Sequence, residues 1–166
     1  MALTPAELDE LAALLRRLAA EGGALPTTPR PIWDALAGVV PRLAVELFVR
    51  EGEAILLTWR DDPQWHGWHV PGGFVGVGES LADAARRIGL RELDVALELE
   101  AVVADFAWPD HPCGAVLSLL CACRCPQAPS LSPATGGFFG ALPTPMVQHH
   151  ATFVDRFRRA VAQAAW

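Results

Sequence analysis

The chain has 166 residues, 52% of them hydrophobic, which is the size of one compact domain with a well-buried core. Its formal net charge of −6 at pH 7 argues against a nucleic-acid backbone as the main partner, because neutralising phosphates requires a basic surface. Charged residues interrupt the apolar part of the N-terminus, and no run of about eighteen apolar residues is free of charge, so we expect no signal peptide, no membrane span and a cytoplasmic location.

The first part of the chain has a helical pattern. Thr4 and Glu7 form a capping box around Pro5, and leucines then recur on one face until a pair of glycines ends the helix. A connector rich in proline follows, with a short helix expected over residues 32–37. We expect residues 1–39 to be a helical extension packed on one domain formed by residues 40–166.

Strand-like and helical patterns alternate through this domain. Four longer runs have the apolar pattern of strands: residues 42–50, 54–60, 95–108 and 114–125. The first two are separated by Glu51-Gly52-Glu53, which predicts a hairpin. A short strand over 68–71 enters a glycine-rich loop, and Ser80 then caps a helix over 81–93. Thr144-Pro145 is expected to cap a last amphipathic helix that runs nearly to the C-terminus.

Three of the four cysteines alternate in the run LSLLCACRC. Cys121, Cys123 and Cys125 would point to one face of a strand, because successive odd positions share a face. One interpretation makes them small core residues. The other, a metal cluster, needs ligands that converge from more than one element.

The glycine-rich loop and the helix after it suggest a site for a hard cation. Glu79 and Glu92 lie near opposite ends of the expected helix, about 20 Å apart at 1.5 Å per residue, so they cannot share one ion directly. The loop over 73–78 is long enough to double back and bring the Gly72 backbone near Glu92. One carboxylate and one main-chain carbonyl would suit Mg²⁺ that takes its remaining ligands from water and substrate phosphates.

The spacing of this stretch resembles the box that defines the Nudix hydrolases. Gly73, Glu79, Arg87, Glu92 and Val95 stand at matching positions, and the resemblance extends over about residues 40 to 165. It implies an α/β fold, an α/β/α sandwich around a mixed sheet, here with an extra N-terminal helix. It also implies metal-dependent hydrolysis of a nucleoside diphosphate linked to another group.

The sequence departs from the Nudix box at three positions. Ile88 and Arg91 stand where most members have acids, and Asp94 stands where the box has glycine. A similar thinning occurs in the GDP-mannose mannosyl hydrolase branch, which uses one Mg²⁺ and a histidine base from a later loop. This branch is the nearer resemblance, although Phe74 replaces its phosphate-facing arginine and the loop LSPATGG has no histidine or acid.

The resemblance implies a role for each matching residue. Mg²⁺ would be bound by Glu92, the Gly72 carbonyl and Glu79, and the substrate by Arg60 and Gly73. Glu92 and Arg87 would act in catalysis, with His111 as a candidate base. Three alternatives stay open: Glu79 stabilising the loop and the helix dipole, Arg87 pairing with Asp83, and Arg91 being a solvated charge or a cation that replaces a metal ion.

Other histidines and the tryptophans are weaker candidates for the same site. His69 lies in the strand that enters the loop, and His149 and His150 lie in the last helix, where packing is the simpler interpretation. Four tryptophans border the expected cleft in sequence, where one could stack on a base or pack in the core: Trp59, Trp65, Trp68 and Trp108.

Three functions follow from these patterns. The first is an Mg²⁺-dependent hydrolase of a nucleotide-linked small molecule, with a nucleotide sugar as one candidate substrate. The second is a degenerate binding or regulatory protein that keeps the pocket and has lost the reaction, which Ile88 and Arg91 favour. The third is a scaffold subunit in which the N-terminal helix mediates a homodimer.

Overall fold

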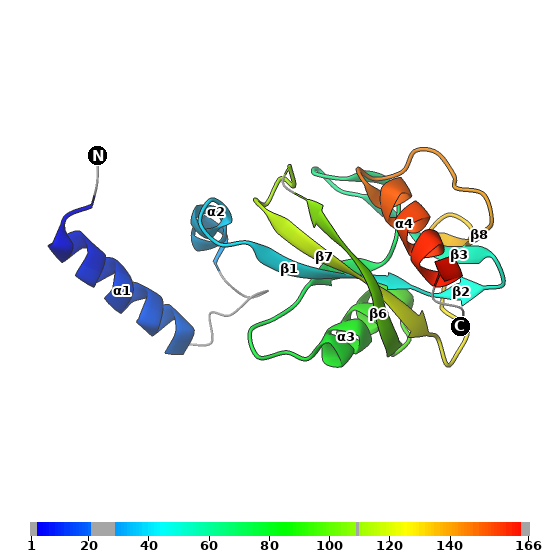
Figure 1. The fold of residues 1–166 in the computed structure, drawn as a ribbon, viewed down its shortest axis with the longest axis horizontal. Helices are drawn as coiled ribbons and strands as arrows, with labels where there is room; N and C mark the ends of the chain where they lie inside the picture. The colour runs from blue at the N-terminus through cyan, green and yellow to red at the C-terminus, as the bar shows by residue number, and fades with distance from the viewer. Residues whose placement is uncertain (1–2, 21–28, 109, 164–166) are drawn as a thin grey trace.

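The computed structural model describes residues 3–20, 29–108 and 110–163, which form four helices and eight strands in these ranges (Figure 1). Two sheets make up the centre of the molecule. The first is mixed and the second is antiparallel. The first has the order β5-β1-β7-β6, from the strands β5 (Gly72–Phe74), β1 (Arg42–Phe48), β7 (Val116–Arg124) and β6 (Glu98–Trp108). The second joins β2 (Arg50–Glu51), β3 (Ala54–Asp61) and β4 (His66–His69), and β8 (Gly136–Phe139) pairs with β3.

Helices cover both sides of the sheets. Helix α3 (Leu81–Leu93) packs its alanines and Ile88 against Val45 and Leu47 of β1. Helix α4 (His150–Gln163) packs Phe153 and Phe157 against the opposite face. Because side chains alternate along a strand, β1 supplies Val45 and Leu47 to the first layer and Ala44 and Phe48 to the second. The predicted α/β sandwich around a mixed sheet is confirmed.

The pairing of the first two long strands differs from the sequence prediction. Only the short β2 forms a hairpin with β3, where Arg50 lies opposite Ile55. Strand β1 instead pairs in parallel with β7 and antiparallel with β5, so that Glu46 lies opposite Gly72. The chain therefore changes sheets between Phe48 and Arg50. This change places the β1 strand directly beside the glycine-rich loop.

The last helix begins later than Thr144-Pro145 predicted. Helix α4 starts at His150, because the backbone before it is engaged with β4. The Trp68 amide donates to Pro145 O, and the Val147 amide donates to Trp68 O, at 2.9 Å each. A segment that pairs with a strand in this way cannot also make helical hydrogen bonds.

The N-terminal extension contains two helices of different character. Helix α1 (Pro5–Ala20) has the predicted capping box, with the Thr4 amide donating to Glu7 Oε2 at 2.7 Å, but none of its residues is buried and it lies clear of the sheets in Figure 1. Helix α2 (Arg30–Ala37) does contact the domain, through Trp33 packed edge-on against Phe74 and under the Arg42 guanidinium. Helix α2 thus contacts the domain, no residue of α1 is buried, and the packing of residues 1–39 on the domain stays a prediction.

No helix in the described part of the chain is long and apolar enough to cross a membrane. The predicted division of the chain at residue 39 stays a prediction.

Candidate active site

Two adjoining cavities open beside the glycine-rich loop. The smaller one, about 180 Å³, lies over β1 and β7, and the larger one, about 670 Å³, reaches the C-terminal end of α3. They share five lining residues: Arg60, His69, Gly72, Gly73 and Phe74. Together they form one cleft around the β5 strand, which is where the sequence placed the site.

The C-terminal end of α3 brings three predicted or candidate site residues together. The Arg91 guanidinium donates to the Gly72 carbonyl at 2.8 Å and, from the same nitrogen, to Glu92 Oε1. The loop therefore does double back to set the Gly72 backbone beside Glu92, as the loop length indicated. The second carboxylate oxygen, Glu92 Oε2, is buried and has no hydrogen-bond partner among the described residues.

Glu79 and Arg87 form a clamp on the loop. Arg87 donates to both oxygens of Glu79 at 2.7 Å and to the Phe74 carbonyl at 3.0 Å, while the Gly76 amide donates to Glu79 Oε2 at 2.8 Å. The hydrogen bonds from Arg87 lower the pKa of Glu79. Both Glu79 oxygens are thus occupied, and Glu79 does not line the cleft. These contacts favour the loop-stabilising alternative for Glu79, and its role as a metal ligand stays a prediction.

Arg87, which belongs to helix α3, also holds the loop in place. Its partners are Glu79 and the loop backbone, with no hydrogen bond to Asp83, so the predicted pair with Asp83 is wrong. Asp83 instead accepts from the Ser80 hydroxyl at 2.6 Å within the cap of α3. Arg87 still lines the larger cavity.

A buried acid that the sequence analysis did not select lies at the floor of the smaller cavity. Glu46 of β1 accepts a hydrogen bond from Ser118 at 2.9 Å, and burial raises its pKa to about 8, with the nearby Glu92 carboxylate contributing. A Cβ at Gly72 would lie 2.4 Å from Glu46 Oε2, so only glycine permits this approach. An acid within the apolar strand RLAVELF was the sequence signal that could have found it.

His111 lies in the smaller cavity but is poorly suited to be a base. Its Nδ1 accepts a hydrogen bond from the Cys113 amide at 2.9 Å, so the neutral ring carries its proton on Nε2 and has no lone pair left to accept another. Burial lowers its pKa to about 4, with the positive charges of Arg42 and Arg60 adding to the effect. His111 thus lines the cleft, and its hydrogen bond disfavours a role as a base, which stays a prediction.

The other histidines are held by hydrogen bonds. His69 contacts Thr58 Oγ1 at 3.0 Å and the Val70 carbonyl at 2.9 Å through its two ring nitrogens, and burial lowers its pKa. His150 Nδ1 accepts from the Val70 amide at 3.1 Å. These contacts agree with a structural role for both rings.

Arginine and aromatic side chains complete the walls. Arg60 of β3 lines both cavities and pairs with Asp62. Trp65 and Trp108 line the smaller cavity, and the buried Trp108 Nε1 has no hydrogen-bond partner among the described residues. Trp59 lines the larger cavity, whereas Trp68 packs on Phe139. The cleft is thus lined by the positively charged Arg60 and by an aromatic wall of tryptophans.

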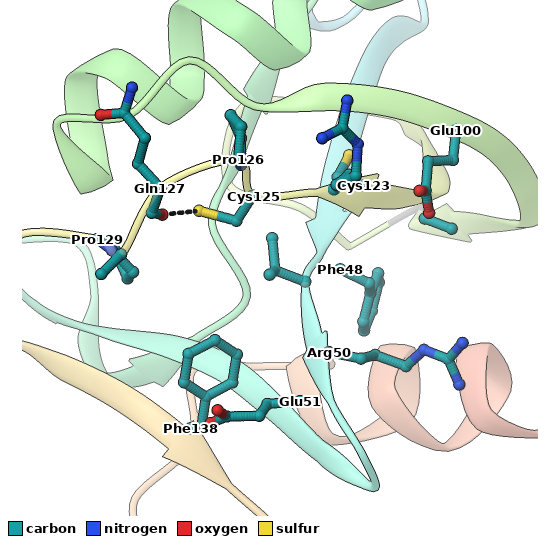
Figure 2. A pocket seen from close by; sticks show the side chains of 14 residues that line it. Phe48, Arg50, Glu51, Glu100, Cys123, Cys125, Pro126, Gln127, Pro129 and Phe138 are labelled. Carbon is teal, nitrogen blue, oxygen red and sulfur yellow. Dashed lines mark hydrogen bonds between the residues drawn. The ribbon is translucent and has the colours of Figure 1, made fainter.

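A separate cavity of about 510 Å³ lies at the far end of β7 (Figure 2). Figure 2 shows Arg50, Glu51 and Glu100 around it, with the Cys125 thiol donating to the Gln127 carbonyl. None of the residues predicted for the site lines this cavity. Cys123 lines it as well, and burial raises the pKa of its thiol to about 12.

Few oxygen donors at the cleft are placed where a metal ion could bind. Within residues 3–20, 29–108 and 110–163, no group of three or more His, Cys, Asp or Glu side chains could hold an ion, which also removes the cysteine cluster as an interpretation. The Glu92 carboxylate and the Gly72 carbonyl lie together as hard oxygen donors, and the buried Glu46 carboxyl lies beside Gly72. The orphaned Glu92 Oε2 is a buried acceptor that a cation would satisfy.

Comparison with known families agrees with this fold. Residues 39–113 match the sequence model of the NUDIX domain. The match includes β1, the glycine-rich loop, α3 and His111. The resemblance to the Nudix hydrolases that the sequence predicted is thereby confirmed, whereas the GDP-mannose mannosyl hydrolase branch stays a prediction.

Individual relatives cover different shares of the chain. The Low-salt glycan biosynthesis protein Agl8 of Haloferax volcanii is 37% identical over 84 residues, which are 49% of this chain and 54% of that protein. The chain thus spans about half the length of this curated relative.

Two solved structures share the fold at low sequence identity. A MutT NUDIX hydrolase from Burkholderia pseudomallei has a TM-score of 0.59 and 21% identity, covering 70% of this chain and 98% of its own. A UDP-X diphosphatase has a TM-score of 0.59 and 16% identity, covering 97% of this chain and 86% of its own.

Proposed function

We propose that this protein is an Mg²⁺-dependent Nudix-type hydrolase acting on a nucleoside diphosphate linked to another group, with nucleotide sugars as the favoured substrates. The observation that carries the proposal is the meeting of Glu92, the Gly72 carbonyl and the two arginines Arg60 and Arg91 at one cleft of a NUDIX domain. The names of two similar proteins, a glycan biosynthesis protein and a UDP-X diphosphatase, support nucleotide sugars as the class to test first.

Each cleft residue has a task in this reaction. Glu92 and the Gly72 carbonyl would hold Mg²⁺, whose charge would neutralise that of the diphosphate when it is bound. Arg60 binds phosphate oxygens from the opposite wall, as a planar guanidinium can in a bidentate manner. Gly73 leaves the backbone open to the ligand, because a side chain there would come within 3.3 Å of the Arg91 guanidinium.

The clamp and the smaller cavity position the substrate. Arg87 and Glu79 fix the loop that presents the Gly72 carbonyl, so Arg87 is a positioning residue in the proposed reaction. The aromatic wall of Trp65 and Trp108 offers stacking surface for a base or a sugar ring, and the free Trp108 Nε1 offers one donor.

A substrate panel tests the proposed function. The panel contains nucleoside diphosphate sugars, dinucleotides and nucleoside triphosphates, each incubated with Mg²⁺ or with EDTA, and products are separated by ion-exchange chromatography. We expect Mg²⁺-dependent turnover of at least one nucleoside diphosphate sugar. Nucleotide binding measured by calorimetry without any turnover would contradict the proposal.

That contrary result would favour the degenerate binding protein. One observation supports this second candidate: Ile88 is fully buried in the core and Arg91 occupies two acceptors at the site, so neither position supplies the usual acid. A homodimer and a cytoplasmic location are further parts of the proposal.

A further inference from the structure

The contacts of Arg91 place a cation where the metal ion of the proposed function would bind. A single nitrogen of its guanidinium, Nη2, donates to both the Gly72 carbonyl, at 2.8 Å, and to Glu92 Oε1. These are one main-chain and one carboxylate oxygen, the same pair that remains available for Mg²⁺. The positive charge and the bridging position are therefore those of a bound ion, supplied by the chain itself.

Arg91 and a metal ion cannot share these two oxygens. Mg²⁺ binds oxygen at about 2.0–2.1 Å, and the Arg91 guanidinium now lies between these two oxygens and hydrogen-bonds to both. An ion placed between them would also lie against the guanidinium, and two positive charges at that distance repel each other. An ion that bridges these two oxygens would therefore compete with the Arg91 side chain for its position.

The surroundings of Arg91 permit that movement. Its side chain is 53% exposed, whereas that of Glu92 is 17% exposed, so the arginine can turn into solvent while the carboxylate stays in place. Gly72 and Glu92 are its hydrogen-bond partners in the described structure. Glu92 Oε2, buried and without a partner among the described residues, would then face an ion instead of remaining unpaired.

The cleft also offers Arg91 a second partner when a substrate enters. Arg91 lines the 670 Å³ cavity together with Arg60, and a diphosphate bound near Arg60 would lie within the same cavity. A guanidinium binds phosphate oxygens well, because its planar fork matches their geometry. The diphosphate would thus compete with Glu92 and Gly72 for Arg91.

We propose that Arg91 is a built-in competitor of the metal ion, which occupies the Gly72 and Glu92 oxygens in the free protein and moves to the diphosphate when substrate binds. The inference rests on the proposed function for its ligand, a divalent cation with a diphosphate. It makes metal binding and diphosphate binding cooperative, since each ligand favours the same displaced position of Arg91.

Metal titration without turnover tests the competition. Binding of Mn²⁺, as a probe of the Mg²⁺ site, is followed by the EPR signal of the free ion in the full chain. The variants are Arg91→Gln, Arg91→Met, which keeps the apolar stem, and the matched control Arg86→Gln, an exposed arginine on the same helix. Circular dichroism melts verify that each variant is folded.

We expect both Arg91 variants to bind one Mn²⁺ at least tenfold more tightly than the wild type, and Arg86→Gln to bind like the wild type. Adding Glu92→Gln to Arg91→Gln should abolish the gain. Equal or weaker binding by the Arg91 variants would overturn the competition.

A second titration tests the role of the diphosphate. Methylenediphosphonate, which cannot be hydrolysed at its bridge, is present at fixed concentration, and it should tighten Mn²⁺ binding by a larger factor in the wild type than in Arg91→Gln. An equal factor in both would overturn the transfer of Arg91 to the diphosphate.

These results separate the inference from the proposed function. Tighter Mn²⁺ binding by the Arg91 variants without turnover of any panel substrate would support the competition and reject the hydrolase. Turnover of a panel substrate, together with unchanged Mn²⁺ binding by the Arg91 variants, would support the hydrolase and reject the competition.

Discussion

Glu46 is the residue whose environment departs most from what its sequence neighbours suggest. It sits in an apolar strand, is buried at the cleft floor, and has a pKa raised from 4.5 to about 8. Its neighbour Gly72 has no side chain, and this lets the carboxylate and the loop backbone approach closely. The charged form of Glu46 therefore destabilises the folded protein, and the residue lies next to the candidate site.

The free energy of unfolding should consequently depend on pH through Glu46. Between pH 4.5 and about 8 the folded protein binds more protons at Glu46 than the unfolded chain does, so stability falls as pH rises, by at most about 1.4 kcal/mol per pH unit. Glu46→Gln removes this pH-dependent loss of stability. The free energy of unfolding of the variant, relative to that of the wild type, should therefore increase from pH 5 to pH 8.

Urea unfolding at three pH values in the absence of metal measures this pH dependence of the free energy of unfolding. Glu51→Gln, at an exposed position, is the control. Parallel profiles for Glu46→Gln and the wild type would contradict the account.

Ile88 shows why the missing acid of the Nudix box cannot simply be restored. Its side chain is fully buried against the core side chains of β1. Ile88→Glu would bury an unpaired carboxyl group, which typically costs several kcal/mol, whereas Ile88→Val should cost about 0.5–1.5 kcal/mol. Chemical denaturation compares the two, and a loss for Ile88→Glu no larger than that for Ile88→Val would show that this position can turn toward solvent.

At the scale of the element, α3 and its loop act as one unit. Ser80 caps the helix at its start, and Asp94 ends it in a left-handed conformation with φ of 58°, the position where the box has glycine. Arg87 reaches back from the middle of the helix to Glu79 and Phe74. The loop that presents Gly72 is thereby fixed at both of its ends.

Breaking the clamp should loosen this loop. Glu79→Gln removes the charge that pairs with Arg87, and we expect a loss of about 1–2 kcal/mol, since the pair is partly exposed. Amide hydrogen exchange of residues 74–79 should accelerate about five- to thirtyfold, with α4 unaffected. Unchanged exchange in the loop would mean that Arg87 and Glu79 do not hold it.

Much of this element could be predicted from the sequence, because its information is local. Ser80, Asp83 and the spacing of apolar residues set the bounds of α3 at 81–93. The sheet partner of β1 and the start of α4 could not be predicted, since both depend on pairing with distant segments: β1 with Val116–Arg124, and Pro145–Val147 with Trp68. Within the site, the proximity of Glu92 and Gly72 could be predicted from residue spacing and loop length. The hydrogen bonds to both oxygens of Glu79 and the tautomer of His111 could not be predicted, because they depend on the folded structure.

At the scale of the whole molecule, α1 presents an apolar face without a partner in the described structure. Four of its leucines are 40% to 52% exposed: Leu8, Leu11, Leu14 and Leu15. A second copy of the chain is the partner that the sequence suggested for this helix.

We therefore expect light scattering to find a dimer for the full chain and a monomer after deletion of residues 1–23. Replacing Leu8 and Leu15 by Glu should have the same effect as the deletion. A monomeric full chain would contradict the dimer, and the site in residues 39–113 would be unaffected by that result.

The most direct test of the account is the rate of hydrolysis of the best panel substrate by Glu92→Gln. We expect kcat/KM to fall at least a hundredfold with saturating Mg²⁺, because the Glu92 carboxylate would lose the charge with which it binds the ion. Glu100→Gln, at the separate cavity of Figure 2, should keep the wild-type rate. Full activity of Glu92→Gln would show that the metal and the reaction lie elsewhere.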